Sequence, residues 1–269
     1  GNKMKKTAIA LAVASALASP AFAASFVNGG FENGDTTGWS VGGGNANVSS
    51  RSSVATSALN PADWLSGGAH YNAANSNSAI INPAYVDPNV GAALGTTVYA
   101  GNSSYRVENT TNGGYASAIS QSVIGYTATD IFFAWKAVLE NGGHSEEQSA
   151  AMVLTLRDDT TNTTLITRTY NAGNGGGGVD ATRFSSLGGT FYTPQWQIEQ
   201  LTIDASLSGH DFTMSVLAAD CSPTGHYGYV YLDGFGTQRP TGNVPEPASM
   251  ALLGLGLAGL AASRRRKSV

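Results

Sequence analysis

The chain has 269 residues, of which 12% are charged and 34 are Gly. An average globular protein has about 25% charged residues and about 7% Gly, so this composition excludes coiled coils and long charged helices, and the Gly residues lack the three-residue period of collagen. Residues 24–243 hold seven Lys and Arg against 17 Asp and Glu, a net charge of −10, and no two basic residues are close in sequence. Nucleic acid is bound through clustered basic side chains, so we expect no nucleic-acid partner. Divalent cations and neutral sugars are compatible with this charge.

The first 23 residues have the pattern of a secretory signal peptide, and residues 1–3 add no fold information. Lys5 and Lys6 precede an apolar stretch from Ala8 to Ala18, and Ala21-Phe22-Ala23 supplies the small residues that signal peptidase requires. A buried amphipathic helix is the alternative, but it would not need these pieces in this order. We expect export, with cleavage after residue 23.

Residues 24–243 contain few helix signals and many strand signals. Runs rich in β-branched and aromatic residues, most of them bounded by Gly, Asn, Asp or Pro, predict eight strands. These strands are residues 99–108, 115–124, 130–139, 150–157, 163–170, 196–207, 211–218 and 228–235.

Residues 158–162 between two of these runs predict a hairpin loop, and the alternating side chains of 163–170 indicate a sheet with one buried face. Residues 42–95 are interpreted as long loops between the first strands. The Gly-rich stretch 171–178 lacks the Lys and the strand-to-helix context of a phosphate loop, so we interpret it as a surface loop. The prediction is a single all-β domain over residues 24–243, folded as a two-sheet antiparallel β-sandwich or jelly roll.

Two short motifs lie at the ends of this domain. The opening run Phe26-Val27-Asn28-Gly29-Gly30-Phe31-Glu32, followed by Gly38-Trp39, and the closing run Tyr229-Val230-Tyr231-Leu232-Asp233-Gly234-Phe235 resemble the ends of galactose-binding-like jelly rolls, which include many carbohydrate-binding modules. The resemblance implies that Glu32 and Asp233 lie close together and hold a structural Ca²⁺. Oxygen ligands suit this hard cation, which an extracellular site can bind at millimolar concentration. The alternative is a pair of solvated strand-end acids.

The candidate stacking surfaces for sugar rings are four aromatic side chains: Trp39, Trp196, Tyr229 and Tyr231. Strand parity places both tyrosines on one face of the last strand and Val230 and Leu232 on the other. If Val230 and Leu232 are buried, the tyrosines form an exposed or loop-covered stripe. In the alternative, the large aromatic rings fill the sandwich.

Cys221 and His226 lie in the turn before the last strand. A nucleophile and its base need a fixed geometry, which five residues of turn do not establish. The segment also offers at most two ligands for Zn²⁺. We expect a structural turn with a buried thiol, and a single Cys excludes an internal disulfide.

Three carboxylates and one His lie between residues 140 and 147, in a loop between two predicted strands. A glycosidase needs two carboxyl groups on opposite sides of the sugar bond, and the sequence does not define their separation. A solvated acidic turn is our expectation, with a second cation site as an alternative.

The C-terminal end combines three pieces in a fixed order. Pro245-Glu246-Pro247 is followed by 15 uncharged residues, 248–262, and then by the basic residues Arg264, Arg265, Arg266 and Lys267. A helix of that length spans about 22 Å, short of the roughly 30 Å of a hydrocarbon core, so it is a marginal transmembrane anchor. The basic cluster acts as a stop-transfer signal that remains in the cytoplasm.

This order of pieces closely resembles the PEP-CTERM sorting tail. The resemblance implies a Gram-negative bacterium whose exosortase recognises Pro245, Glu246 and Pro247 and removes the tail. Such proteins are associated with exopolysaccharide and with biofilm or floc matrix. The alternative is a plain single-span anchor.

Together these features predict a protein that is exported across the inner membrane, transiently anchored by residues 244–269, and then placed at the cell surface or outside the cell. Its expected partners are signal peptidase, exosortase and polysaccharide, and we expect no catalytic activity. Two alternatives remain: a polysaccharide hydrolase that uses the loop carboxylates, and a structural matrix protein that assembles through its edge strands.

Overall fold

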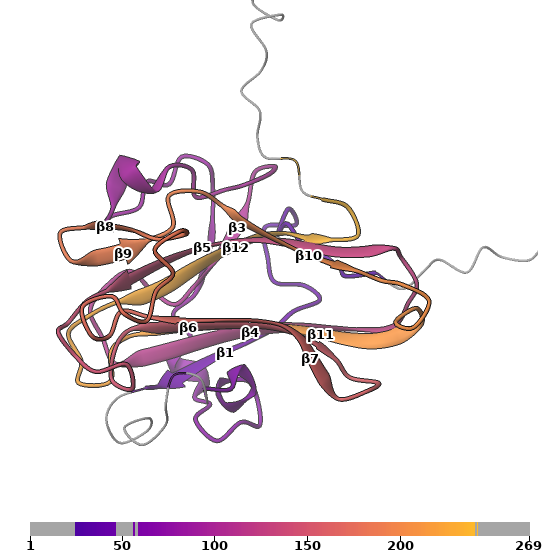
Figure 1. Cartoon of the computed structure of the whole chain (residues 1–269), viewed down its shortest axis with the longest axis horizontal. Helices are drawn as coiled ribbons and strands as arrows, with labels where there is room; N and C mark the ends of the chain where they lie inside the picture. The colour runs from indigo at the N-terminus through magenta and orange to yellow at the C-terminus, as the bar shows by residue number, and fades with distance from the viewer. Residues whose placement is uncertain (1–24, 47–55, 57–58, 240, 242–269) are drawn as a thin grey trace, which may run out of the picture.

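The computed structural model describes residues 25–46, 56, 59–239 and 241. Two β-sheets face each other as two layers, and nearly all regular structure is strand (Figure 1). The predicted all-β, two-sheet antiparallel sandwich is therefore confirmed. The expected signal peptide and the expected C-terminal apolar helix lie outside the described residues. Within the described residues, none of the helices is long and apolar enough to span a membrane.

The lower layer of Figure 1 is a five-stranded antiparallel sheet. Its order is β1 (Ser40–Asn45), β4 (Tyr115–Tyr126), β11 (His210–Ala219), β6 (Ala151–Asp158) and β7 (Thr163–Asn171).

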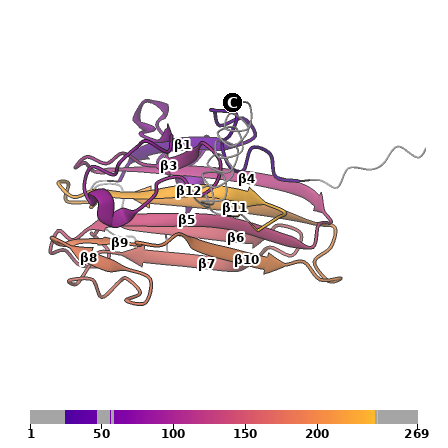
Figure 2. The same cartoon turned by 90° about the horizontal axis from the view of Figure 1, so that it is seen from above.

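The upper layer is a seven-stranded antiparallel sheet. Its order is β2 (Ala79–Ile81), β3 (Ser104–Val107), β12 (Gly228–Gly236), β5 (Asp130–Glu140), β9 (Thr190–Tyr192) and β8 (Ser185–Leu187), and β10 (Gln197–Thr202) also pairs with β5. Seen from above, the axes of the long strands in the two layers are nearly aligned (Figure 2). Because the chain crosses repeatedly between the layers, many strand neighbours, such as β4 and β11 or β5 and β12, come from distant parts of the sequence.

Each of the eight predicted runs contains a strand. Among the described residues, the structure has four further strands that the sequence did not predict. Three of these, β2, β8 and β9, have only three residues each. The fourth, β1, contains three consecutive Gly residues, which ordinarily weaken a strand. Here the loop over residues 60–76 crosses directly above β1, because a Cβ on Gly44 would lie 1.9 Å from the carbonyl oxygen of His70. β1 therefore needs Gly for close approach of another backbone.

The main core lies between the sheets and is built from the inward faces of both. Phe133, Trp135, Val230 and Leu232 from the upper sheet and Leu154, Met214 and Val216 from the lower sheet are fully buried there. The strand parity predicted for β12 is confirmed. Each such side chain contributes about 1.5–3 kcal/mol when it is fully removed from water.

Loops cover the outer face of each sheet and bury it as well. Trp64, in the short 3-10 turn η2 (Pro61–Trp64), packs on small side chains of the lower sheet, including Ala118 and Ala219. On the upper sheet, Val90 and Leu94 pack over Tyr229 and Tyr231. The two tyrosines therefore form the loop-covered stripe that was one of the alternatives.

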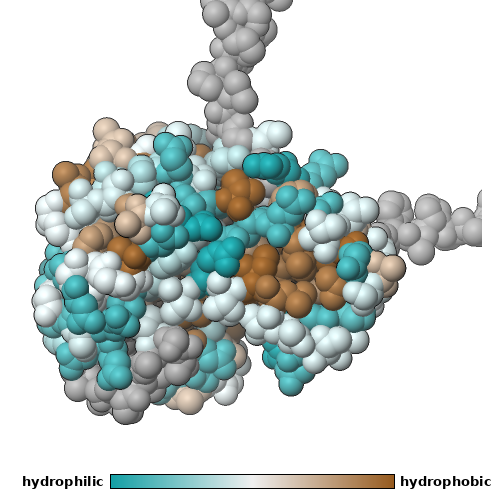
Figure 3. Space-filling view, viewed as in Figure 1, coloured by the Kyte–Doolittle hydropathy of each residue, from teal (hydrophilic) through white to brown (hydrophobic). Residues whose placement is uncertain are grey.

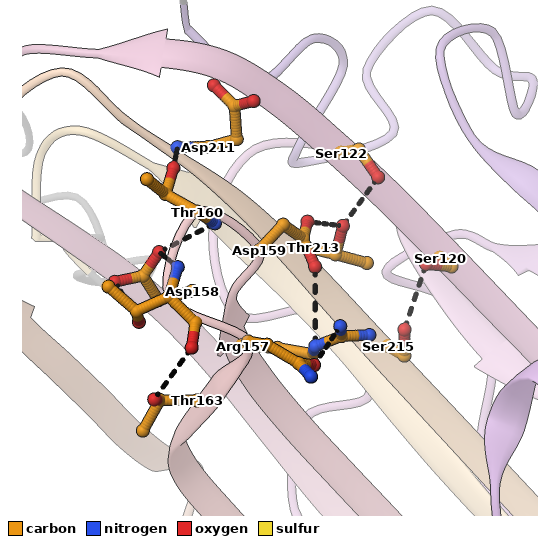
Figure 4. Close-up of polar contacts among 12 residues, drawn as sticks. Ser120, Ser122, Arg157, Asp158, Asp159, Thr160, Thr163, Asp211, Thr213 and Ser215 are labelled. Atoms are coloured by element: carbon orange, nitrogen blue, oxygen red, sulfur yellow. Dashed lines mark hydrogen bonds and ion pairs between the residues drawn. The ribbon is translucent and has the colours of Figure 1, made fainter.

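The predicted hairpin between β6 and β7 is confirmed, and polar contacts attach its loop to β11 (Figure 4). Asp158 accepts hydrogen bonds from the backbone N–H groups of Thr160 at 3.0 Å and Thr161 at 3.2 Å. The hydroxyl of Thr160 accepts one from the backbone N–H of Asp211 at 2.9 Å, and the Thr213 hydroxyl donates to Asp159. These contacts fix the end of the five-stranded sheet.

At the edges of the two sheets, partly buried apolar side chains lie between the layers. Figure 3 shows such an apolar area to the right of centre, within an otherwise largely polar face. Leu165 of β7 and Leu201 of β10 are partly buried and pack against the core at these edges.

Candidate functional site

A polar cleft of about 740 Å³ lies where the β5–β6 loop meets the end of β7 and the Gly-rich loop that follows it. Its wall combines carboxylates, amides and one aromatic ring. The side chains with this chemistry are Glu146, Glu147, Asp180, Asn171, Asn174 and Tyr170. Such a set offers hydrogen bonds to hydroxyl groups together with one apolar face.

Tyr170 is held in place from within the sandwich. Its ring centroid is 5.0 Å from that of Phe184 and 5.8 Å from that of Trp135, a fully buried residue. Tyr170 itself is only partly buried, and burial raises the pKa of its phenol. A neutral ring of fixed orientation therefore forms part of the cleft wall.

Hydrogen bonds tie together the two loops that form the rest of the cleft. The backbone N–H of Asn174 donates to the carbonyl of His144 at 2.9 Å, and the Asn174 amide donates to Glu146 Oε1 at 3.3 Å. The side chain of Asn171 accepts from the backbone N–H of Gly173 at 2.9 Å. The sequence did not predict three of the residues in this cleft, Tyr170, Asn171 and Asn174. The one sequence feature that pointed to this position was a Gly-rich loop directly after a strand.

The three carboxylates of the acidic loop between residues 140 and 147 lie in two different places. Glu146 and Glu147 are exposed and line the cleft, whereas Glu140 is at the end of β5 and accepts a hydrogen bond from the backbone N–H of Tyr227 at 3.3 Å. Two of the three carboxylates of this loop therefore lie in the cleft and the third lies outside it. The hydrolase alternative stays a prediction, because a glycosidase needs two carboxyl groups on opposite sides of the sugar bond.

Glu32 and Asp233, the predicted calcium ligands, converge on one turn. Asp233 is fully buried and accepts backbone N–H groups of Tyr99 at 2.7 Å and Ala100 at 3.0 Å. The Glu32 carboxylate accepts the N–H of Asn102 at 3.0 Å from the same turn. Burial raises the pKa of Asp233 to about 7, and the nearby charge of Glu32 adds to this. Two carboxylates held together in this way are an oxygen donor set that suits Ca²⁺.

The structure revises the predicted sugar-binding aromatics. Trp39 is 8% exposed and Tyr229 and Tyr231 are 0% exposed, so these three rings pack in the interior and present no face to a ligand. Trp196 is only partly buried, and its indole N–H donates to the carbonyl of Thr96 at 3.1 Å. Sugar contact at Trp196 stays a prediction.

The turn before β12 forms a cluster with a distant residue. Cys221 is fully buried, as expected, and its Sγ lies 3.2 Å from His226 Nδ1. His144, from the β5–β6 loop, stands edge-on to His226 with ring centroids 5.1 Å apart. Burial lowers the pKa of His144, and His226 adds to this effect. The sequence indicates only Cys221 and His226 as neighbours, because His144 is far away along the chain.

Comparison with known proteins places one named motif in the chain. Residues 243–267 match the PEP-CTERM protein-sorting motif. No curated protein matches the sequence. The match over residues 243–267 confirms the sorting tail predicted from Pro245, Glu246 and Pro247.

The chain also aligns with solved structures that share little sequence with it. The chain is 10% identical to TmCBM61, solved in complex with β-1,4-galactotriose, with a TM-score of 0.36 over 78% of this chain and 94% of that one. It is 13% identical to the K1 cleaved adhesin domain of Lys-gingipain from Porphyromonas gingivalis W83, with a TM-score of 0.32 over 77% and 94%. It is 13% identical to a cyclase from Fischerella sp. TAU, with a TM-score of 0.33 over 78% and 92%. The protein thus carries a PEP-CTERM protein-sorting motif behind an all-β sandwich.

Proposed function

We propose that the protein is an exported, non-catalytic binding protein whose sandwich associates with extracellular polysaccharide through the cleft at the end of β7. The observation that carries this proposal is the Tyr170 ring, fixed by Phe184 and Trp135 and surrounded by amide and carboxylate groups. An aromatic side chain has an apolar face with a polar end, which matches a sugar ring.

The charge of the cleft favours a neutral polysaccharide over an anionic one. Glu146, Glu147 and Asp180 all line the cleft, and none of the cleft-lining side chains among the described residues is Lys or Arg. Carboxylates accept hydrogen bonds from sugar hydroxyls, but they repel uronate, sulfate or phosphate groups.

The sorting motif supports an extracellular location for this binding. In our proposal, signal peptidase removes residues 1–23, and the exosortase of a Gram-negative bacterium recognises Pro245-Glu246-Pro247 and removes the tail. The acidic sandwich then remains at the cell surface or in the exopolysaccharide of a biofilm or floc matrix.

The proposal is tested by a glycan array of neutral and anionic polysaccharides with the wild-type protein and two variants. Tyr170→Ala removes the ring, and Asn174→Ala removes one amide at the cleft with less risk to the core. Trp196→Ala is the control, because its ring lies outside the cleft and was the remaining sugar-binding candidate.

We expect selective binding to a neutral glycan that is weakened in both cleft variants and kept in the control. Loss of binding only in Trp196→Ala would move the site to that residue. Absence of binding to any glycan, with the fold verified by circular dichroism, would refute the proposal and favour the structural matrix alternative.

We also propose that Glu32 and Asp233 bind a structural Ca²⁺. Their convergence on the 99–103 turn supports this. A ligand that binds only the native state raises the melting temperature. Equal melting temperatures in Ca²⁺ and in chelator would therefore refute it.

A further inference from the structure

Three side chains with nitrogen or sulfur donors meet at the end of the sandwich where the β5–β6 loop approaches the turn before β12. His144 comes from the loop, and Cys221 and His226 come from the turn. One ligand atom of each lies within 4.8 Å of the ligand atoms of the other two. The thiol is fully buried and both imidazoles are partly buried.

The positions of these atoms are close to those of a tetrahedral metal site. With metal–nitrogen distances of about 2.0–2.1 Å and a metal–sulfur distance of about 2.3 Å, neighbouring tetrahedral ligands are about 3.3–3.6 Å apart. Cys221 Sγ and His226 Nδ1 are 3.2 Å apart, and the third ligand needs a shift of about 1 Å or a little more to reach the same geometry.

One imidazole nitrogen at this cluster lacks a partner. His144 Nε2 is buried and has no hydrogen-bond partner among the described residues. A buried polar atom without a partner costs about 1–3 kcal/mol, and such a group in a native structure requires an explanation. Coordination of a cation would give His144 Nε2 a partner. A hydrogen bond between Cys221 and His226 alone would not.

Backbone hydrogen bonds around the cluster hold the three side chains in position. The backbone N–H of Cys221 donates to the carbonyl of His226 at 3.0 Å, which closes the turn, and the N–H of Ser222 donates to the carbonyl of Gln148 at 2.9 Å, which ties the turn to the loop. Gly142 leaves the space that both imidazoles occupy, because a Cβ there would lie 2.3 Å from His226 Nδ1 and 2.7 Å from His144 Cδ2.

From this geometry we propose that His144, Cys221 and His226 bind a divalent transition metal, with Zn²⁺ as the best fit. Thiolate and imidazole donors select such cations over Ca²⁺ and Mg²⁺, which prefer oxygen. Three protein ligands leave a fourth position for water, as in Zn²⁺ sites with an open coordination position. The ion would join the β5–β6 loop to the turn before β12, and none of its three ligands belongs to the proposed Ca²⁺ site or lines the proposed glycan cleft.

The test uses the full chain, freed of metal with a chelator, returned to buffer containing millimolar Ca²⁺, and titrated with Co²⁺ and Zn²⁺. We expect one equivalent of Co²⁺ to produce a thiolate-to-metal charge-transfer band, and Zn²⁺ to displace it. Calorimetry with Zn²⁺ should give the same stoichiometry.

Variants then assign the ligands. Cys221→Ser should abolish the charge-transfer band, and His144→Gln and His226→Gln should each weaken Zn²⁺ binding at least about 10-fold, since even changes in residues that support ligands cost 10- to 100-fold. His70→Gln is the matched control, because His70 lies beside Trp64 and away from the cluster. Melting curves in chelator verify that each variant folds.

Three results would overturn the proposal. The first is the absence of the charge-transfer band when stoichiometric Co²⁺ is added to the wild-type chain. The second is a charge-transfer band that persists in Cys221→Ser, and the third is an unchanged Zn²⁺ affinity in His144→Gln. The first of these needs no variant, so the proposal is testable even where a substitution prevents folding.

Discussion

Asp87 is the buried acceptor that holds the 82–97 loop on the outer face of the upper sheet, and its removal gives a sharp test of the loop-covered stripe. Its carboxylate accepts the hydroxyl of Tyr229 at 2.9 Å and that of Tyr231 at 2.8 Å. It also accepts the backbone N–H groups of Asn89 at 3.0 Å and Val90 at 2.8 Å. Asp87→Ala leaves these four donors without their acceptor in a site that is 2% exposed.

The expected loss of stability is large. Each buried donor left unsatisfied costs about 1–3 kcal/mol, and relaxation of the loop recovers part of the sum, so we expect about 3–6 kcal/mol in total. This is a large fraction of the roughly 5–15 kcal/mol by which a domain is stable. For a domain of this size, 1 kcal/mol shifts the melting temperature by about 2–4 °C, which predicts a decrease of about 6–24 °C.

Urea unfolding followed by tryptophan fluorescence measures this free energy. Asp87→Asn is the matched variant, because its amide keeps the shape and one acceptor oxygen and should lose less than Asp87→Ala. A double-mutant cycle of Asp87→Asn with Tyr231→Phe should give a coupling energy of about 0.5–3 kcal/mol, as for residues in direct contact. A loss below 1 kcal/mol in Asp87→Ala, or no coupling in the cycle, would refute the reasoning.

Three further predictions concern buried groups elsewhere in the sandwich. Because the folded state holds the Asp233 proton with a pKa of about 7, against about 3.9 when unfolded, this group should lower stability in chelator by on the order of 3 kcal/mol as pH rises from 4 to 7. Other carboxyl groups with shifted pKa values, such as Glu108 and Asp158, add their own pH dependence, so the measurement is the difference in urea unfolding between wild type and Asp233→Asn at each pH; a difference that stays constant over this range would contradict the prediction. Gly44→Val should cost about 1–3 kcal/mol or more by overpacking against the His70 carbonyl, whereas Gly236→Ala, with no atom near its Cβ position, should melt close to wild type. Arg168→Met should cost about 1–3 kcal/mol in the same unfolding assay, because it removes the main partner of the Glu199 carboxylate, which is 5% exposed, while Arg183 at 3.8 Å and the Trp135 indole N–H at 3.1 Å remain; an unchanged midpoint would show that these two partners satisfy Glu199.

The local sequence determined eight of the strands and the all-β class of the fold. Alternation in the last core run places Val230 and Leu232 on one face and Tyr229 and Tyr231 on the other whatever the neighbouring strands are, since side chains of a strand point to opposite faces in turn. The sorting tail is equally local, because Pro245-Glu246-Pro247, an apolar run and a basic end are contiguous. Such features are visible without a fold because each depends only on residues close together in the chain.

Only the tertiary structure decided which side chains meet. The burial of Tyr229 and Tyr231 depends on Asp87 in a loop more than a hundred residues away, and the approach of His144 to Cys221 depends on where the β5–β6 loop lies over the turn before β12. The Tyr170 cleft likewise combines three separate segments. Loop conformations of this kind follow from contacts between distant segments, which have no periodicity in the sequence, so the sites could be located only once both sheets were in place.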